Sequence, residues 1–452
     1  MRFTHLGRAA EIGANSYLIE TDSARVVLDC GMHPKEEGMD AIPNYKSFES
    51  EAVDSIILTH SHLDHAGTLP VVQRQHPEAQ VYMTAPTRAL ADALLHNSTN
   101  VMQSKGEELG IKEYPLFGHK ELERLYKKWI ERDYKRPFAM DADGTIHGTF
   151  YDAGHILGSA GILLETDEKS VFYTGDVQFD DQTLLKGADF PERPVDALIM
   201  ETTRGAYERP AGFTREKEED RFMQALVDGL KGGGSVLIPV FAMGKTQEVL
   251  TMIYLAKERG ILAQNVPVFI GGLSTKMSYI FDEFSDTTRR KLEDFNIFED
   301  MEIKTGNRRK RTPIAYQPGA IYALSSGMMS PKTVSNVFAR SFINNANNHL
   351  LFVGYAEETT PAFAIKNAKP GDDVLLEEGK DPVPLRCNVE KFDFSGHAPR
   401  EHLLDYALKL NPKKTLLVHG DMEAMEWFKD QLNEKAPEME VLIPKPGEVH
   451  EL

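Results

Sequence analysis

The stretch THSHLDHAG carries three histidines and one aspartate within six consecutive positions, His60 to His65. A strand-like run, SIILT, comes directly before it, so the tight loop that follows can point His60 and His62 toward one place. Asp64 and His65 can then face a second position next to the first. Imidazole and carboxylate groups are ligands that suit zinc, and a catalytic zinc site leaves one position open for water. Because chance clustering of this order after a strand is improbable, the spacing predicts two adjacent metal sites.

Further candidate ligands follow other strand-like runs. His155 lies in YDAGHILGSAG, between glycines that let the backbone approach closely, Asp176 ends FYTGD, and His419 lies in LLVHGD. Each of these residues taken alone is more often an ordinary loop residue, but their joint placement beside glycine-rich loops favours metal binding. Cys30 and Cys387 are the only cysteines, so any metal must be held by histidine, aspartate or glutamate side chains.

Short apolar runs alternate with longer helical patterns along the chain. The strand-like runs span 24–29, 54–59, 170–176, 196–201, 235–242, 267–272, 349–355 and 414–421. The helical patterns span 87–103, 214–231, 244–260 and 399–410. Strands that alternate with helices indicate an α/β protein, in which active sites gather at strand ends. Residues from about 202 to 370 form a self-contained series between two ligand-rich segments, so we predict one domain inserted into another.

Length and composition narrow the class of protein. The chain has 452 residues, enough for two or three domains, and 41% of them are hydrophobic. The polar start MRFTHLGRAAEIG and the lack of a long apolar run predict neither a signal peptide nor a membrane span, so we expect a cytoplasmic protein without a membrane partner. The ending LIPKPGEVHEL predicts no appended C-terminal domain.

The formal net charge of −18 argues against general polyanion binding, so a nucleic-acid substrate would need a local basic surface. NRRKR (307–311) and YKKWIERDYKR (126–136) are the candidate basic stretches. A solvated charged face is at least as common an explanation for both. Other histidines without ligand-rich surroundings are expected to be structural: His5, His33, His119, His147, His349 and His402.

The candidate ligands occur in an order that resembles the metallo-β-lactamase superfamily, and the resemblance spans nearly the whole chain. The matching residues are Asp29, His60, His62, Asp64, His65, His155, Asp176 and His419. The resemblance implies an αββα sandwich, formed here by residues 1–201 and 371–452. It also implies a site for two zinc ions, with manganese as an alternative metal.

Each ligand has an implied place in that site. The resemblance assigns one zinc to His60, His62 and His155. It assigns the other zinc to Asp64, His65 and His419. Asp176 would bridge the two ions, and Asp29, in VLDCG, would support the histidine loop from behind the ligands and fix their orientation.

Three motifs narrow the resemblance to one branch. Glu201 in IMETTRGAYERP, His397 in FDFSGHAPRE and His419 in LLVHGD look like motifs A, B and C of the β-CASP nucleases. The stretches IPVFAMGKTQEVL, ALSSGMMS and FVGYAEETTPA resemble the inserted α/β β-CASP domain, which would occupy 202–370. A histidine in motif C is typical of RNA-directed members, so the resemblance implies single-stranded RNA as the substrate.

The implied reaction is phosphodiester hydrolysis. Two zinc ions about 3.5–4 Å apart can lower the pKa of bound water toward 7 and hold the phosphoryl oxygens. By the resemblance His397 protonates the leaving 3′-oxygen, Glu201 orients His397 through a hydrogen bond, and Asp64 also belongs to the catalytic set. Arg204 and Tyr207 depart from the aromatic-Gly-Asp-Arg sequence usual after motif A. The N-terminal EIGANSYLIE resembles ribonuclease J, whereas Glu201 in motif A resembles the polyadenylation-type enzymes, so cleavage from the 5′ end and internal cleavage both stay open.

Substrate contacts and rival functions complete the prediction. Lys245, at a helix start, and Ser325 and Ser326, in ALSSGMMS, are expected RNA phosphate contacts. GKT is not part of a P-loop, because Pro239 occupies the place of the required glycine. We expect a zinc-dependent ribonuclease, with a homodimer as an open alternative to a monomer. The rival functions are a DNA-directed β-CASP nuclease, a small-molecule hydrolase of the metallo-β-lactamase fold and a silent scaffold, although no ligand is missing here.

Overall fold

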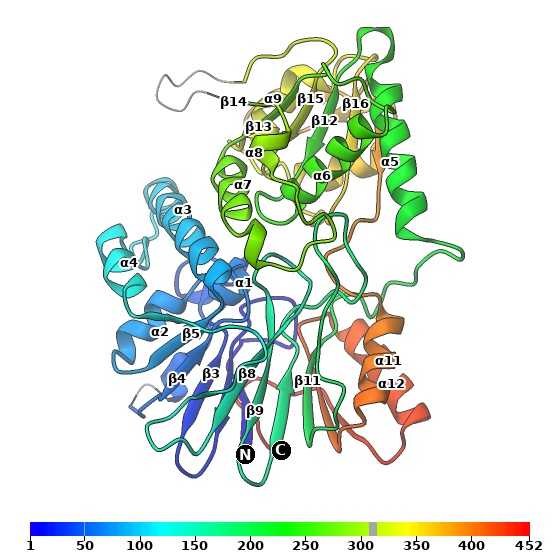
Figure 1. Cartoon of the computed structure of the whole chain (residues 1–452). Helices are drawn as coiled ribbons and strands as arrows, with labels where there is room; N and C mark the ends of the chain where they lie inside the picture. Colours follow the sequence, from blue (N-terminus) through cyan, green and yellow to red (C-terminus); the bar gives the residue numbers. More distant parts are fainter. Residues whose placement is uncertain (49, 307–313) are drawn as a thin grey trace. The chain divides into compact units, whose positions relative to one another are not determined.

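The computed structural model describes residues 1–48, 50–306 and 314–452 (Figure 1). Two compact units divide the chain. Unit 1 comprises Met1–Asp180, Gly187–Arg209 and His397–Leu452, and unit 2 comprises Asp181–Lys186 and Pro210–Gly396. Residues 371–396, which we assigned to the first domain, lie in unit 2, because β19 (Asn388–Lys391) pairs with β16 (His349–Phe352) in the sheet of that unit.

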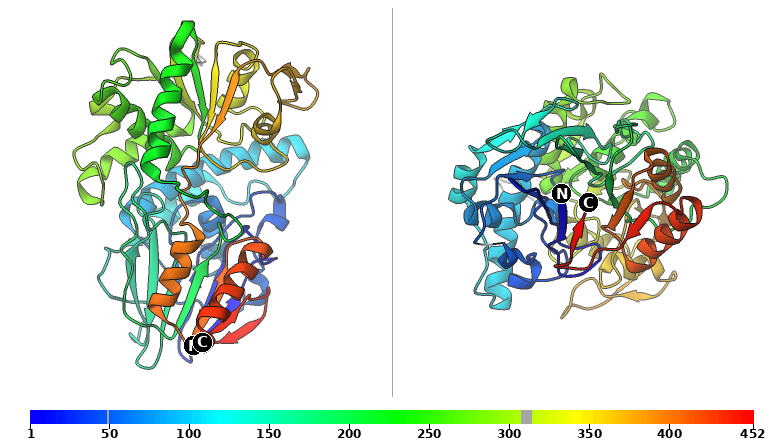
Figure 2. Two further views of the ribbon diagram at one scale, coloured as in Figure 1. Left: turned by 90° about the vertical axis from the view of Figure 1, so that its right-hand side faces the viewer. Right: turned by 90° about the horizontal axis from the view of Figure 1, so that it is seen from below.

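Unit 1 contains two seven-stranded sheets. The order in the first sheet is β22 (Val449–Glu451), β1 (Arg2–His5), β2 (Tyr17–Glu20), β3 (Arg25–Leu28), β4 (Ser55–Ile57), β5 (Gln80–Met83) and β6 (Trp129–Glu131). The order in the second sheet is β21 (Glu440–Leu442), β20 (Lys414–Val418), β11 (Ala197–Glu201), β10 (Ser170–Tyr173), β9 (Ala160–Glu165), β8 (His147–Asp152) and β7 (Phe138–Ala139). The N and C termini lie side by side in both views of Figure 2, because β1 pairs with β22.

Helices cover the outer face of each sheet of unit 1. The helices on the first sheet are α1 (Leu63–Ala66), α2 (Leu69–Gln75), α3 (Ala85–Leu109) and α4 (His119–Tyr126). The helices on the second sheet are α11 (Arg400–Leu410) and α12 (Met422–Lys435). Successive side chains of β11 alternate between two cores: Ile199 packs between the sheets and Leu198 packs beneath the helices. The resulting order of layers confirms the predicted αββα arrangement.

Unit 2 is an α/β unit built on a six-stranded sheet. The strand order is β14 (Ile303–Thr305), β13 (Val268–Gly271), β15 (Ile321–Leu324), β12 (Val236–Pro239), β16 and β19, and neighbouring strands are parallel. A separate hairpin joins β17 (Asp373–Val374) and β18 (Val383–Pro384). The helices are α5 (Arg215–Leu230), α6 (Lys245–Glu258), α7 (Leu273–Glu283), α8 (Ile297–Asp300), α9 (Val334–Phe342) and α10 (Pro361–Asn367).

The strands and helices expected from apolar patterns are present in both units. Helix α3 has residues that mark both of its ends. Its N-cap Thr84 accepts a hydrogen bond from the Thr87 backbone N–H, and it ends at Gly110 with a left-handed φ of 70°. Among the described residues, no helix is long and apolar enough to cross a membrane.

Candidate active site

The candidate ligands of unit 1 follow the carboxyl ends of strands. Strands β3 and β4 run parallel, and Asp29 and His60 come just after them. Strands β10, β11 and β20 are also parallel neighbours, so Asp176, Glu201 and His419 reach the same edge of the second sheet. Parallel pairing therefore brings together residues that are far apart in the sequence.

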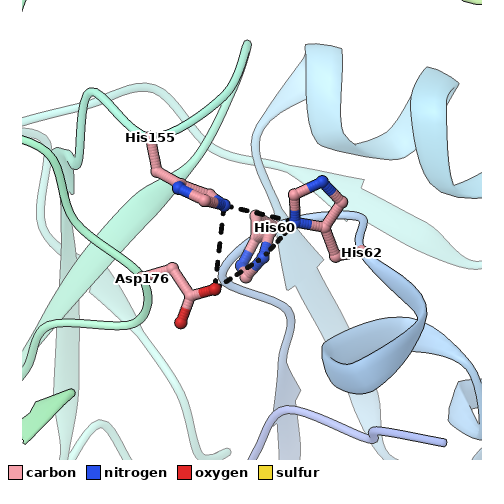
Figure 3. Close-up of side chains that lie close together, drawn as sticks. All are labelled: His60, His62, His155 and Asp176. Carbon is pink, nitrogen blue, oxygen red and sulfur yellow. Dashed lines mark hydrogen bonds and ion pairs between the residues drawn. The ribbon is translucent and has the colours of Figure 1, made fainter. Parts of the chain in front are cut away.

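One cluster contains three histidines and one carboxylate. Figure 3 shows His60, His62, His155 and Asp176 pointing toward one another. His62 Nδ1 lies 3.2 Å from Nε2 of His60 and 3.2 Å from Nε2 of His155. Asp176 Oδ2 lies 3.4 Å from His60 Nε2 and 3.7 Å from His155 Nε2. Three ring nitrogens and one oxygen thus form a donor set for a divalent transition metal.

A second cluster lies on the other oxygen of the same carboxylate. Its members are Asp64, His65 and His419. Asp176 Oδ1 lies 3.3 Å from His65 Nε2 and 3.1 Å from His419 Nδ1. Asp64 Oδ2 lies 3.4 Å from His419 Nε2. The two oxygens of Asp176 therefore face two different clusters, which is the geometry a bridging ligand needs.

Asp29 holds the second cluster from behind. Its Oδ2 lies 2.8 Å from His65 Nδ1 and accepts a hydrogen bond from Tyr173 Oη at 2.8 Å. Its Oδ1 accepts the Thr59 backbone N–H at 2.8 Å. A carboxylate beside Nδ1 holds a proton on that nitrogen, so Nε2 is the atom of His65 that could bind a metal. Gly31 lets the backbone come this close, because a Cβ there would lie 1.9 Å from the Asp64 carbonyl oxygen.

Glu201 and His397 form a third group beside these clusters. His397 Nδ1 lies 3.1 Å and 3.2 Å from the two Glu201 oxygens. The backbone N–H groups of Val177 and Thr203 donate to the same carboxylate, at 2.7 Å and 3.3 Å. The His397 side chain is 22% exposed and Glu201 only 1%, and the His397 ring centroid is 4.6 Å from that of His155. A buried carboxylate thus orients an accessible imidazole next to the ligand clusters.

Comparison with known proteins identifies the family. The model described as "Metallo-beta-lactamase superfamily" matches residues 10–219, the "Beta-Casp domain" matches 246–365, and the "Zn-dependent metallo-hydrolase RNA specificity domain" matches 382–444. Transcription termination factor FttA of Methanocaldococcus jannaschii is 31% identical over 440 residues, which cover 93% of this chain and 67% of that protein. The chain belongs to the β-CASP branch of the metallo-β-lactamase superfamily.

Other relatives of this β-CASP protein are longer than it is. Endoribonuclease YSH1 of Candida glabrata is 29% identical over 469 residues, which cover 100% of this chain and 59% of the relative. Cleavage and polyadenylation specificity factor subunit 3 of Dictyostelium discoideum is 28% identical, with 98% and 56% covered. The chain thus spans 56% to 67% of the length of these relatives. A crystal structure of a protein of unknown function from Enterococcus faecalis V583 has the same fold, with a TM-score of 0.60 and 12% identity over 100% of this chain and 99% of that one.

The metallo-β-lactamase fold implies a divalent metal, and the residues present fit one. Asp176 Oδ1 is buried and accepts no hydrogen bond from a described residue. Such an oxygen ordinarily costs about 1–3 kcal/mol, and a bound cation would satisfy it. Burial lowers the pKa of His60, and it lowers that of His62 to about 4, so both rings are neutral and can bind metal at pH 7.

The carboxylates of this metallo-β-lactamase site stay ionised although they are buried. Burial acts to raise the pKa of Asp176, but the neighbouring histidines, His419 first, outweigh it and hold that pKa well below its usual range. Burial also acts to raise the pKa of Asp64, but the hydrogen bond with His419 and the charges of His65 and His419 together lower it. Burial likewise opposes protonation of His397, but the charges of Glu201 and Asp176 raise its pKa above 6.5. The site therefore combines anionic carboxylates with an imidazole whose protonated form is favoured by its neighbours.

The expected substrate contacts lie in the β-CASP unit, where each has partners. Lys245 begins α6, and its Nζ donates to the Phe394 carbonyl oxygen. Ser325 Oγ donates to the Gly271 carbonyl oxygen at 3.3 Å, and Ser326 Oγ accepts the Ser330 N–H at 3.2 Å. The basic run at 307–311 lies outside the described residues. The stretch 126–136 contributes the buried Trp129 of β6, so part of it belongs to the core.

Two polar contacts of the metallo-β-lactamase site were missed by sequence reasoning. Asn15 Nδ2 lies 3.2 Å from His65 Nε2 and donates to the Asp64 carbonyl oxygen at 3.1 Å. Thr203 Oγ1 lies 3.0 Å from His419 Nδ1. The position of Thr203 two residues after Glu201 was a usable signal. No sequence signal indicated Asn15, because this residue approaches the candidate ligands only when β2 lies in the same sheet as β4.

Proposed function

We propose that this β-CASP protein is a metal-dependent ribonuclease that hydrolyses the phosphodiester bonds of single-stranded RNA. The observation that carries the proposal is the pairing of His397 with Glu201 beside two metal-ligand clusters. The two clusters alone fit hydrolases of many substrates, whereas an imidazole held beside them can in addition protonate the leaving 3′-oxygen of a phosphodiester. Relatives named endoribonucleases, and the match of 382–444 to an RNA specificity domain, support RNA as the substrate.

We assign the metal ligands in two sets. His60, His62 and His155 hold one zinc ion. Asp64, His65 and His419 hold the other. Asp176 faces both sets, and manganese is the alternative metal. Such ions, when bound, lower the pKa of water and stabilise the charge that develops on phosphoryl oxygens.

The chain's own residues then orient groups and deliver a proton. Glu201 accepts from Nδ1 of His397, which leaves Nε2 of that ring to give its proton to the leaving 3′-oxygen. Asp29 keeps the proton of His65 on Nδ1 and so keeps Nε2 available as a ligand. Lys245, Ser325 and Ser326 stay proposed contacts to RNA phosphates. The two-domain limits, a cytoplasmic location and a homodimer stay predictions from the sequence.

The test is cleavage of end-labelled RNA and of DNA of the same sequence, with and without a chelator. We expect the metal-loaded protein to cut RNA, the chelator to stop it, and His397→Ala to slow it by about 10²–10⁴-fold. His402→Ala is the matched control, because this exposed histidine contacts Asp180 and belongs to neither cluster. RNA left intact by the metal-loaded protein would refute the proposal, and faster cutting of DNA would favour the DNA-directed alternative. Product lengths distinguish trimming from internal cleavage.

A further inference from the structure

Two threonines join the end of β11 to the end of β20. Thr202 Oγ1 donates to the Val418 carbonyl oxygen at 2.9 Å, and Thr203 Oγ1 donates to the His419 carbonyl oxygen at 3.3 Å. The Thr202 backbone N–H donates to the same His419 oxygen at 3.1 Å. Because the two strands are parallel neighbours, these contacts hold the backbone of His419 against the residues that follow Glu201.

His419 depends on such support because its backbone is strained. Its φ of 50° lies in the left-handed region, where a residue with a Cβ stays only when its surroundings hold it there. Gly420 follows, and a Cβ at that position would lie 2.2 Å from Thr202 Oγ1. The chain thus turns directly beside the two threonines, and the turn brings the His419 ring to the Thr203 hydroxyl.

The Thr203 hydroxyl indicates which ring nitrogen of His419 carries a hydrogen. Its Oγ1 lies 3.0 Å from His419 Nδ1. A hydroxyl has one hydrogen, and that of Thr203 goes to the His419 carbonyl oxygen, so Oγ1 accepts the hydrogen of Nδ1. Nδ1 also lies 3.1 Å from Asp176 Oδ1, but that oxygen accepts no hydrogen bond from a described residue. The neutral ring therefore keeps its lone pair on Nε2.

The Nε2 atom of His419 faces a carboxylate of the second cluster. It lies 3.4 Å from Asp64 Oδ2, and ligand atoms about 2.0–2.1 Å from a tetrahedral zinc ion are about 3.4 Å apart. The other histidine of this cluster is held in the same way, because Asp29 lies beside His65 Nδ1 and leaves Nε2 as the atom that could bind a metal. Thr203 thus has for His419 the place that Asp29 has for His65.

We propose that Thr203 is a positioning residue that holds His419 Nε2 toward the second metal ion. This role rests on the metal-ligand sets of the proposed function and gives one of them a further residue. Thr203 also touches the proton donor's partner, because its backbone N–H donates to Glu201 Oε2 at 3.3 Å. A change of the side chain leaves that N–H in place, so the metal site can be altered without removing the support of Glu201.

The test is competition between the metal-free full chain and a chromophoric chelator for Zn²⁺. Every protein carries His62→Ala and His155→Ala, which remove two of the three histidines of the first set and leave the second set intact. Thr203→Val keeps the shape of the side chain but removes the hydroxyl, so the zinc affinity should fall by about 10–100-fold. Thr203→Ser keeps a hydroxyl and should restore most of that affinity. Circular dichroism checks that the variants keep the fold.

Thr202→Val is the matched control. It removes a hydroxyl from the same junction of β11 and β20, but the hydrogen bond of that hydroxyl goes to a backbone oxygen and not to the His419 ring. The zinc affinity should therefore stay at the value of the background protein. Equal losses in Thr202→Val and Thr203→Val would show that the junction acts through the backbone alone, and this would overturn the proposal.

Two further outcomes separate this proposal from the ribonuclease proposal. Unchanged or higher zinc affinity in Thr203→Val would overturn the role of Thr203, even in a chain whose first set is restored and which cuts RNA. A loss of zinc affinity that Thr203→Ser restores, in a protein that leaves RNA intact, would support the role of Thr203 and refute the ribonuclease proposal.

Discussion

Two buried carboxylates, one in each unit, have opposite surroundings. Asp176, in the metallo-β-lactamase unit, is 2% exposed, and its Oδ1 accepts no hydrogen bond from a described residue. Glu248, on α6 of the β-CASP unit, is 3% exposed, and both of its oxygens accept: Arg215 donates to Oε1 and the Leu184 N–H donates to Oε2 at 3.1 Å. Hydrogen bonds from the fold explain why the Glu248 carboxylate can be buried. A buried carboxylate oxygen that accepts no hydrogen bond and lies among histidines indicates a functional role.

The largest effect on activity is expected from Asp176→Asn. The change removes the charge that faces both clusters, so RNA cleavage should fall by about 10³-fold or more, equivalent to several kcal/mol of lost stabilisation. The metal-free protein should lose some stability as well, because the change removes a charge that interacts favourably with the neighbouring histidines, His419 first. Initial cleavage rates and urea denaturation measure the two quantities. A large loss of stability with activity retained would reverse the contrast with Glu248.

Glu248→Ala should show the opposite pattern. It removes the acceptor of the buried Thr183 and Leu184 N–H groups and one of the two carboxylate partners of Arg215, which keeps Glu219, so we expect a loss of about 1–3 kcal/mol in the stability of the β-CASP unit. Urea denaturation followed by circular dichroism measures this loss. The control is Glu299→Ala, which truncates an exposed carboxylate of the same unit and should change stability by less than about 0.5 kcal/mol. Equal unfolding curves for the two variants would contradict a structural role for Glu248.

Asp29→Asn tests how the site is supported without removing a ligand. The amide can no longer act as the anion that holds the proton on His65 Nδ1, so metal affinity should fall by about 10–100-fold. Competition with a chromophoric chelator measures the affinity. The comparison with Asp176→Asn is informative because Asp29→Asn should regain activity at high metal concentration. Unchanged affinity would show that Asp29 has no part in orienting the ligand.

Glu201→Gln should give the smallest effect, seen in the pH dependence of cleavage. The Glu201 charge raises the pKa of His397, and an acid catalyst works below its pKa and fails as the pH rises through it. Removing that charge should lower this pKa and move the alkaline limb of the rate profile to lower pH. Glu201 contacts His397 directly, so we expect the acidic limb of the rate profile to stay at the same pH. An alkaline limb that did not move would exclude His397 as the proton donor.

Much of this site could be predicted because its signals are local in the sequence. A run of ligands directly after an apolar strand identifies His60, His62 and His65, and glycine-flanked strand ends identify His155 and Asp176. The α/β class followed from the apolar runs, whereas the αββα order of layers came from the resemblance to the metallo-β-lactamase superfamily. These predictions needed only the fact that carboxyl ends of parallel strands meet at one edge of a sheet.

The missed features depend on contacts between distant segments. Strand β19 carries the polar sequence NVEK, so nothing local showed that 388–391 would pair with β16 in the β-CASP unit. Tyr173 reaches Asp29 across 144 positions of the chain. His119, which we expected to be structural, meets His96 only because α3 and α4 pack together. Pattern and spacing do not carry such information, because it arises from tertiary packing.

The most direct test of the central claim is a metal titration. The metal-free protein is titrated with Zn²⁺ while cleavage of an end-labelled single-stranded RNA is followed. If both clusters hold a metal and share Asp176, activity should rise from zero and reach its maximum at two ions per chain, and Asp176→Asn should stay inactive throughout. Full cleavage by the metal-free protein, or equal cleavage by Asp176→Asn, would contradict the account.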